Sequence, residues 1–517
     1  MKKLVTILAL VLVTGTALFA QTPAWSWYVS DKGNDNDNNG RSPEQAFRTF
    51  QKAFTSAAAS NVKTITVVGK TTVTGSAFLY EGSGAAEILL TGQDENAQMD
   101  FRLSYGEKAP PSKLRIESLR ITDEFTIGGP VNLTLGRDAV FEDVEFKGNG
   151  KDLSITMEAN AVVRQTKYPY SSVTISEGAF LMKDNALISG AGASVSGVYN
   201  TASFAMQDNA KIENSQGDGV DLVRCDFTMM DKASITGCRD TGIVVNWRST
   251  ATLQDNASIT GCGRTTSSFT EPPLMGGGIR VGGDAVVVLM GNTVISGNKA
   301  RQGGGIYFTS DGTKEQIYDN STPTLSRPDD LRKANQRISA RYRGSITSLI
   351  IQDKVQITGN EAGEGGGIYA VRGSASITVT FTTNDDGRIP KASPAVTAPA
   401  VTGVVMNGGT ISGNKADYGA GVYAVEALEV EHVRYTPPAQ AYGKDFFVYN
   451  LGSYIEDADR KSPVPAFTLN GGSVTGNEAQ FVGGGVYAKV KGAYQAGRGT
   501  LSGNTAGDGE GENLYTP

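Results

Sequence analysis

One short phrase recurs with small changes through the second half of the chain, and it restricts the fold more than any other feature. Its copies read ISGNKARQGGGIY from Ile295, ITGNEAGEGGGIY from Ile357, ISGNKADYGAGVY from Ile411 and VTGNEAQFVGGGVY from Val474. A truncated copy, LSGNTAGDGEGENLY, begins at Leu501. A unit this short cannot enclose a hydrophobic core alone, so it must stack on its neighbours. The repeat therefore predicts a solenoid.

The same frame continues into the preceding sequence. Isoleucines recur there at steps of roughly 24 residues, at Ile188, Ile212, Ile235 and Ile259. Each unit contains two or three short alternating strands, separated by Gly, Asn and Asp turns, and it has no helical periodicity. A leucine-rich repeat would show a helix in each unit, so we expect an all-β fold, a right-handed parallel β-helix solenoid.

Four regions follow along the chain. The first reads as a secretory signal peptide, because two lysines precede an apolar run that ends in small residues. A loop with a capping helix comes next, and irregular, strand-rich sequence follows, which we interpret as degenerate first coils. Regular coils make up the rest. The predicted boundaries are 1–20, 21–60, 61–180 and 181–517.

The capping helix is predicted from a start signal and an apolar stripe. Ser42-Pro43-Glu44-Gln45 resembles a capping box with proline at the first helical position. An apolar face follows, formed by Phe47, Phe50, Ala53, Phe54 and Ala57. A single amphipathic helix before a solenoid is best placed over its open end.

Three stretches break the period and are predicted to be loop insertions, near residues 310–345, 373–401 and 425–464. All three leave the coil shortly after the Gly-Val/Ile-Tyr phrase, so they should emerge at one corner of the solenoid. Insertions on one face often mark a binding face, although loops also vary wherever they are tolerated. The third insertion is rich in aromatic residues, including Tyr442 and Tyr449.

One corner of the coil should carry an asparagine ladder, because an asparagine follows the Ser/Thr-Gly pair in each late repeat. Amide side chains turned inward at a bend can bond their neighbours above and below. The predicted members are Asn298, Asn360, Asn414, Asn477 and Asn504. Cys238 and Cys262 occupy the same column in earlier coils, either as a disulfide or as two stacked thiols.

A column of tyrosines is predicted beside it. Tyr307, Tyr369, Tyr423 and Tyr487 share one register position, and the apolar residue before each should point inward. By alternation the tyrosines face outward. Their rings could serve as a platform for sugars or peptide side chains, or as a stabilising ladder covered by the insertions.

Two groups of acidic residues suggest calcium. Asp35, Asp37 and Asn39 match the first half of a calcium loop, but the glutamate expected further on is replaced by Ala46. A second group recurs at one turn of the coil, at Asp184, Asp208, Asp231, Asp255 and Asp353. Stacked carboxylates could bind Ca²⁺, and Asx turns explain the same pattern without any ion. No other cofactor is expected.

The composition argues against several other classes. The formal net charge of −6 gives no basic footprint for nucleic acid. Three cysteines are too few for a disulfide framework. Beyond the signal peptide we find no apolar stretch of membrane length. The protein is therefore expected to be exported, and either secreted or held at the outer cell surface, with the periplasm as an alternative.

Two resemblances support this picture. The segment WYVSDKGNDNDNNGRSPEQAFRTFQKAF, from Trp27 to Phe54, resembles the opening of secreted pectin-lyase-like β-helix proteins. The repeat phrase is similar to repeats of the polymorphic outer membrane protein family. The resemblance implies the fold, but this fold carries lyases, hydrolases and adhesins alike. The Gly-His-Gly motif of the pectin hydrolases is absent, since the one histidine, His432, lies in an insertion.

The expected function is that of a non-catalytic, adhesin-like binding protein that presents one face to glycans or to host or envelope proteins. The alternatives are a Ca²⁺-dependent polysaccharide lyase and a structural envelope component. The final coil has no obvious cap, so end-to-end self-association is also expected.

Overall fold

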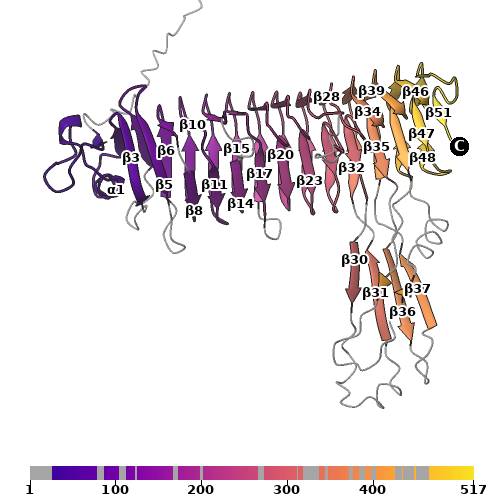
Figure 1. Ribbon diagram of the computed structural model, residues 1–517, viewed down its shortest axis with the longest axis horizontal. Coiled ribbons are helices and arrows are strands. Elements are labelled where there is room, and N and C mark those ends of the chain that lie inside the picture. Colours follow the sequence, from indigo (N-terminus) through magenta and orange to yellow (C-terminus); the bar gives the residue numbers. More distant parts are fainter. Residues whose placement is uncertain are drawn as a thin grey trace, which may run out of the picture.

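The computed structural model shows an elongated parallel β-helix, built from three parallel sheets that run along the long axis (Figure 1). It describes residues 26–77, 87–103, 112–122, 125–166, 173–197, 202–265, 273–310, 313–317, 337–343, 347–371, 376–382, 391–397, 403–425, 433–434, 448–449 and 465–517. No helix among these residues has both the length and the apolarity to cross a membrane.

Each regular coil contributes one strand to each sheet in turn, and equivalent strands of successive coils pair in parallel. Sheet 1 has 15 strands: β1 (Trp27–Val29), β2 (Thr64–Val67), β4 (Glu87–Gly92), β6 (Ser112–Glu117), β9 (Val131–Leu135), β12 (Ser154–Met157), β15 (Gly178–Met182), β18 (Ala202–Met206), β21 (Cys225–Met229), β24 (Thr250–Leu253), β27 (Val286–Leu289), β32 (Ser348–Ile351), β38 (Gly403–Met406), β44 (Phe467–Leu469) and β48 (Tyr494–Ala496).

Sheets 2 and 3 form the other two faces. Sheet 2 has 14 strands: β3 (Lys70–Ala77), β5 (Gln98–Leu103), β7 (Arg120–Ile121), β10 (Val140–Glu142), β13 (Val162–Arg164), β16 (Leu187–Ser189), β19 (Lys211–Glu213), β22 (Ser234–Thr236), β25 (Ser258–Thr260), β28 (Val294–Ser296), β33 (Gln356–Thr358), β39 (Thr410–Ser412), β45 (Ser473–Thr475) and β49 (Thr500–Ser502). Sheet 3 has 12 strands: β8 (Phe125–Gly128), β11 (Phe146–Asn149), β14 (Val173–Ser176), β17 (Ala193–Ser196), β20 (Val220–Val223), β23 (Ile243–Asn246), β26 (Ile279–Val281), β29 (Ile306–Phe308), β35 (Ile368–Val371), β41 (Val422–Val425), β47 (Val486–Ala488) and β51 (Leu514–Tyr515).

The core is a set of stacked apolar columns. In sheet 2 the recurrent isoleucines pair directly, as Ile188 with Ile212 and Ile212 with Ile235, and all are fully buried. In sheet 1, Phe180 and Phe204 stack with ring centroids 4.8 Å apart. Because each strand alternates inward and outward side chains, every coil adds one layer to these columns.

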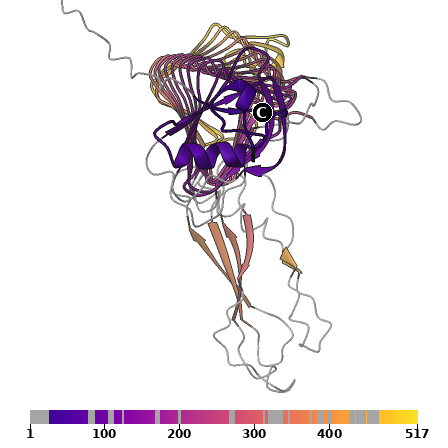
Figure 2. The same ribbon diagram turned by 90° about the vertical axis from the view of Figure 1, so that its left-hand side faces the viewer.

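The N-terminal end is covered by the helix α1 (Phe50–Ala58), which lies over the opening of the coil (Figure 2). Its apolar residues Phe50, Ala53, Phe54 and Ala57 are buried. The helix begins at Phe50, however, and not directly after Ser42 as predicted.

The sequence before α1 is held in a different conformation. Pro43–Gln45 form only a 3₁₀ turn, η1, whose Ser42 makes no side-chain cap bond. Phe47 is extended because its N–H donates to the Tyr28 carbonyl at 2.8 Å, and its own carbonyl accepts from Ser30 at 2.9 Å. This pairing next to β1 delays the helix until Thr49, whose hydroxyl accepts from the Lys52 N–H.

Sheet 3 starts only at β8, so the coils before residue 125 have described strands in sheets 1 and 2 alone. A fourth, short sheet appears in the last coils, consisting of β34 (Glu361–Glu364), β40 (Lys415–Tyr418), β46 (Glu478–Val482) and β50 (Thr505–Ala506). Its strands follow the corner asparagines. Lys415 of β40 pairs with Glu478 of β46 at 3.1 Å, and Glu361 of β34 pairs with Lys299 of the preceding coil at 2.9 Å. The sequence did not predict this sheet.

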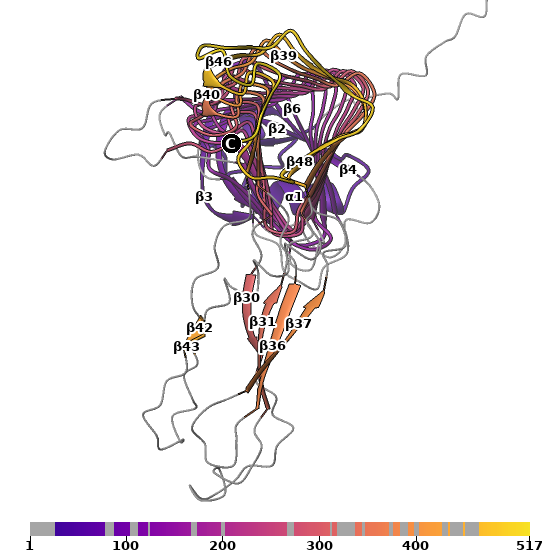
Figure 3. The ribbon, with the colours of Figure 1, turned by 90° about the vertical axis from the view of Figure 1, so that its right-hand side faces the viewer.

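The three insertions leave at one corner, between sheets 3 and 1. They follow β29, β35 and β41 and return to β32, β38 and β44. Strands of the first two form one antiparallel sheet, which we call the arm: β30 (Thr313–Ile317), β31 (Arg337–Arg343), β36 (Ser376–Thr382) and β37 (Lys391–Thr397). The arm projects sideways from the solenoid (Figures 1 and 3). The third insertion contributes β42 (Val433–Arg434) and β43 (Val448–Tyr449), an antiparallel pair.

Candidate functional site

The five predicted corner asparagines form a continuous buried ladder. In each rung one side-chain oxygen accepts from both the backbone N–H and the side-chain amide of the preceding asparagine, at 2.8–3.0 Å. Each amide also donates to a carbonyl of the preceding coil, such as Asn298 to Ile259. Asn513 closes the ladder by accepting from Asn504 at 3.0 Å. Every buried amide is thus satisfied, which makes this a structural element.

The cysteines continue the same column as free thiols. The Cys262 N–H donates to Asn298 at 2.9 Å, and the Cys238 N–H donates to the Cys262 sulfur at 3.4 Å. Of the two predicted states, the structure contains the stacked thiols. The hydrogen bond to Cys262 and burial both raise the pKa of Cys238, so this thiol stays protonated.

The tyrosine column is stacked ring on ring. The centroid distances are 5.2 Å for Tyr307 and Tyr369, 5.3 Å for Tyr369 and Tyr423, and 4.7 Å for Tyr423 and Tyr487. Tyr515 extends the column from Tyr487 at 5.2 Å. The rings point away from the core, as alternation predicts, but Tyr307 is only 7% exposed and Tyr423 only 5%.

This burial favours the stabilising role over the ligand platform for the column, and ligand binding by the tyrosines stays a prediction. A ring whose two faces touch other tyrosines, as in Tyr423, has no face left for a sugar, which suits a stabilising stack in the middle of the column. Burial also raises the pKa of the Tyr423 phenol well above its ordinary value. Tyr442 lies outside the described residues, and Tyr449 lies in β43, paired with Val433.

At its C-terminal end the column widens into an aromatic patch, formed by Tyr418, Phe481, Tyr487 and Tyr515. Tyr418 stacks on Phe481 with centroids 5.1 Å apart and meets Tyr487 edge to face at 6.2 Å. Tyr418 is 37% exposed, and the other three rings are partly exposed. Tyr418 and Phe481 come from β40 and β46 of the short sheet, which brings them beside the column.

Sequence reasoning missed three members of this patch. Tyr515 ends the truncated repeat and could have been aligned with Tyr487, since GENLY replaces GGGVY. Tyr418 and Phe481 stand between the corner asparagine and the glycines, where earlier repeats carry Gln302 and Glu364. Only the short sheet, which the sequence did not predict, shows that this segment faces the tyrosine column.

The repeated aspartates form a ladder of their own. All five have left-handed backbone conformations, with φ between 56° and 58°. The Asp208 carboxylate accepts from the Asp184 N–H at 3.1 Å, and the same bond joins Asp208 to Asp231. Gly291 donates to Asp353 in the same way, at 3.0 Å. The carboxylates thus tie each turn to the preceding coil, which differs from an Asx turn that bonds its own backbone.

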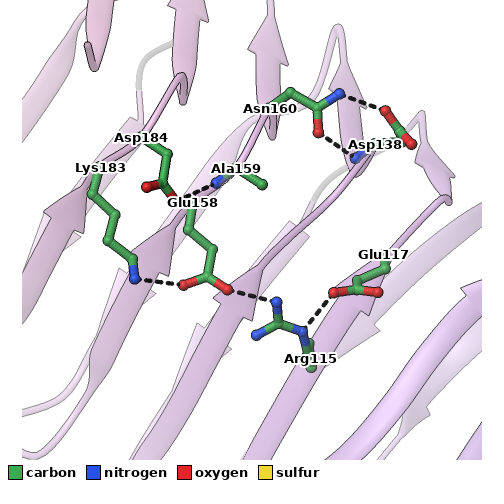
Figure 4. Close-up of polar contacts among 8 residues, drawn as sticks. All are labelled: Arg115, Glu117, Asp138, Glu158, Ala159, Asn160, Lys183 and Asp184. Carbon is green, nitrogen blue, oxygen red and sulfur yellow. Dashed lines mark hydrogen bonds and ion pairs between the residues drawn. The ribbon is translucent and has the colours of Figure 1, made fainter. Parts of the chain in front are cut away.

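A network of ion pairs lies beside this ladder (Figure 4). Glu158 bridges two cations, binding Arg115 at 2.5 Å and Lys183 at 2.9 Å, and Arg115 also binds Glu117 at 2.6 Å. Burial opposes the charge of Arg115, but its two carboxylate partners outweigh that effect and raise its pKa. The hydrogen bond to Glu158 raises the pKa of Lys183.

These shifts bear on the lyase alternative. A lyase base must give up its proton near neutral pH. Arg115 and Lys183 are the cations that contact this carboxylate network, and both are held in the protonated form. Arg115 and Lys183 therefore suit the role of ion-pair partners better than that of a proton-accepting base.

The predicted calcium loop is closed by its own hydrogen bonds. The Asp35 carboxylate accepts from the N–H groups of Arg48 and Thr49 at 2.8 and 3.0 Å, next to the start of α1. Asp37 accepts from Asn34 at 2.7 Å, and Asn39 accepts from the Arg41 N–H at 3.0 Å. Within the described part of the chain, no three His, Cys, Asp or Glu side chains are grouped as metal ligands. Calcium binding at Asp35, Asp37 and Asn39 stays a prediction.

Comparisons with protein-family models, with curated proteins and with solved structures found no match to this chain. The parallel β-helix is therefore established by the structure itself, and the site must be interpreted from its own residues.

Proposed function

We propose that this protein is a non-catalytic binding protein that holds a carbohydrate against the aromatic patch of its last coils. The observation that carries the proposal is the partly exposed cluster of four aromatic rings at the end of a buried tyrosine stack. Aromatic rings with an apolar body and a phenol hydroxyl suit ligands that are part apolar and part polar, as sugar rings are.

The scaffold supports such a role. Tyr487 is fixed by its 4.7 Å stack on Tyr423, and Tyr418 by its stack on Phe481. A rigid platform loses little conformational entropy when a ligand binds, which favours affinity. The arm leaves the solenoid in the same C-terminal half and adds a projecting element to this end (Figure 3).

The wider setting of the proposal comes from the sequence. The predicted signal peptide and the resemblance to pectin-lyase-like and polymorphic outer membrane proteins both suit an exported, adhesin-like protein at a cell surface or in the surrounding medium. The proposed partner is a glycan of the host or of the envelope, and binding to a protein is the alternative outcome.

The test is calorimetric titration of the full chain with neutral oligosaccharides such as cellohexaose, galactan fragments and mannan fragments. We expect Tyr418→Ala and Tyr487→Ala each to weaken binding about tenfold. Tyr28→Ala, at the opposite end of the solenoid, is the matched control and should leave binding unchanged. Equal binding by all four proteins would overturn the proposal.

The same samples test the lyase alternative. Ultraviolet absorbance should stay flat when the protein is incubated with acidic polysaccharides, with or without Ca²⁺. Unsaturated products formed only with Ca²⁺ would contradict a non-catalytic function.

A further inference from the structure

Trp247 is the most exposed large apolar side chain among the described residues, at 58%. It stands at the tip of the turn between β23 and β24, on the corner between sheets 3 and 1. Its backbone is left-handed, with φ of 51°, and Arg248 follows with φ of 64°. Bulky residues rarely adopt this conformation, and each such residue costs stability.

The next coil shows that the fold does not need a tryptophan here. Its equivalent turn has the same two left-handed residues, Gly283 with φ of 61° and Asp284 with φ of 66°. The Arg248 N–H donates to the Gly283 carbonyl at 2.9 Å, which fixes this equivalence. Glycine adopts the conformation without steric cost. Neither backbone geometry nor packing therefore explains an exposed tryptophan at this position.

The turn holds Trp247 firmly in place. Ser249, fully buried, donates from its hydroxyl to the Asn246 carbonyl at 2.6 Å. The same hydroxyl accepts from the Cys225 N–H at 3.2 Å. The indole ring is therefore presented from a fixed backbone and not from a mobile loop.

Two arginines share this corner with Trp247. Arg248 is its neighbour in sequence, and Arg224 occupies the corner of the preceding coil, where its N–H donates to the Trp247 carbonyl at 3.1 Å. Both arginine side chains are exposed, and within the described residues neither makes an ion pair. The nearby Asp226 carboxylate already accepts from the Thr250 hydroxyl at 2.6 Å.

From this arrangement we infer that Arg224, Trp247 and Arg248 form a second binding site, specific for an acidic polysaccharide. The indole face would stack on a sugar ring, and the two guanidinium groups would bind carboxylate or sulfate groups of the same chain. The site involves other coils and another corner than the aromatic patch, so it does not depend on the function proposed there.

The experiment is a titration of the full chain with hexagalacturonate, followed by calorimetry and by tryptophan fluorescence. We expect the Trp247 emission to shift on binding and the affinity to fall as salt is added. Trp247→Gly, which copies the next coil, should weaken binding at least tenfold while the denaturation midpoint stays equal or rises. Arg224→Gln and Arg248→Asn should each weaken it several-fold, and Arg301→Gln, an exposed arginine elsewhere, should not.

Three results would overturn the inference. The first is equal binding of hexagalacturonate by the wild type and by Trp247→Gly, and the second is equal binding of a neutral galactose hexamer. The third is binding of single-stranded DNA or anionic vesicles, but not of hexagalacturonate, at this turn. Tyr487→Ala should leave hexagalacturonate binding unchanged, so failure of the aromatic patch and failure of this site are distinguishable.

Discussion

Asn360 accepts two hydrogen bonds from Asn298 through one side-chain oxygen, and the backbone and side-chain nitrogens of Asn298 both lie 3.0 Å from it. The two residues are 62 positions apart in the sequence, yet they occupy adjacent coils. The Asn360 amide also donates to the Ile295 carbonyl at 3.1 Å. One side chain therefore satisfies buried groups on two other segments.

Removing that side chain should be costly. We expect Asn360→Ala to lower the free energy of unfolding by about 3 kcal/mol or more, because buried donors and an acceptor lose their partners. The matched control is Asn407→Ala, since Asn407 makes a similar bond to Asn470 at 3.1 Å but is exposed. Chemical denaturation measures both, and equal losses would show that burial of the ladder does not matter.

The stability that the tyrosine stack provides should depend on its aromatic rings more than on their hydroxyl groups. Tyr423→Ala removes a buried ring from between two others and should cost about 3–5 kcal/mol. Tyr423→Phe keeps the stack and should cost about 1 kcal/mol or less. Denaturant midpoints distinguish the two variants. If Tyr423→Phe lost as much stability as Tyr423→Ala, the hydroxyl and not the ring would be the stabilising group.

Asp218 should make stability depend on pH. Burial raises its pKa to about 6, helped by the carboxylates of Asp240 and Asp221 and opposed by the Thr241 N–H, which donates at 2.8 Å. The folded state therefore binds the carboxyl proton of Asp218 more tightly than the unfolded state does. The free energy of unfolding should fall as the pH rises from the ordinary aspartate pKa of 3.8 to about 6. Asp218→Asn should gain about 2 kcal/mol near neutral pH and nothing below about pH 4. A gain of the same size at both pH values would contradict this assignment.

The Glu158 network should contribute more than an exposed ion pair. Glu158→Gln leaves Arg115 and Lys183 without their shared partner and should cost about 1–2 kcal/mol. Lys415→Gln breaks a pair whose side chains are mostly exposed and should change stability by about 0.5 kcal/mol or less. Thermal or chemical unfolding at two salt concentrations tests this, and similar effects for both variants would count against the network.

Self-association should occur through the C-terminal coils. β48, β49, β50 and β51 are the outermost described strands at that end, whereas α1 covers the other end. Open strand edges can pair with a second chain. Sedimentation should show dimers that grow with concentration and that Leu514→Lys reduces. A monomer at every concentration would refute the prediction.

The repetitive parts of this fold were predictable because their signal is periodic. A step of roughly 24 residues placed Ile188, Ile212, Ile235 and Ile259 in one column, and parallel pairing joins them in that register. The asparagine position followed from the same alignment. In both cases the same residue type fills the same structural position in each coil. The repetition of that residue in the sequence is therefore enough to predict the column.

Features that depend on contacts between unlike segments were not predictable in this way. The helix start was misplaced because Phe47 pairs with β1, a contact that a local capping signal does not include. The aromatic patch needs Tyr418 and Phe481 beside Tyr487, and these residues hold different positions in the repeat. The aspartate ladder was expected to bond its own turn, but its true partner is a backbone N–H one coil away.

The sheet of the arm joins the first two insertions into one structural unit. β31 of the first insertion pairs along its length with β36 of the second, so neither insertion carries a complete sheet. Moving the arm to another β-helix would require both insertions together with the intervening coil, residues 347–371. Recombination that exchanged one insertion alone would expose a bare strand edge. To keep its sheet complete, the arm would have to be transferred as a single unit.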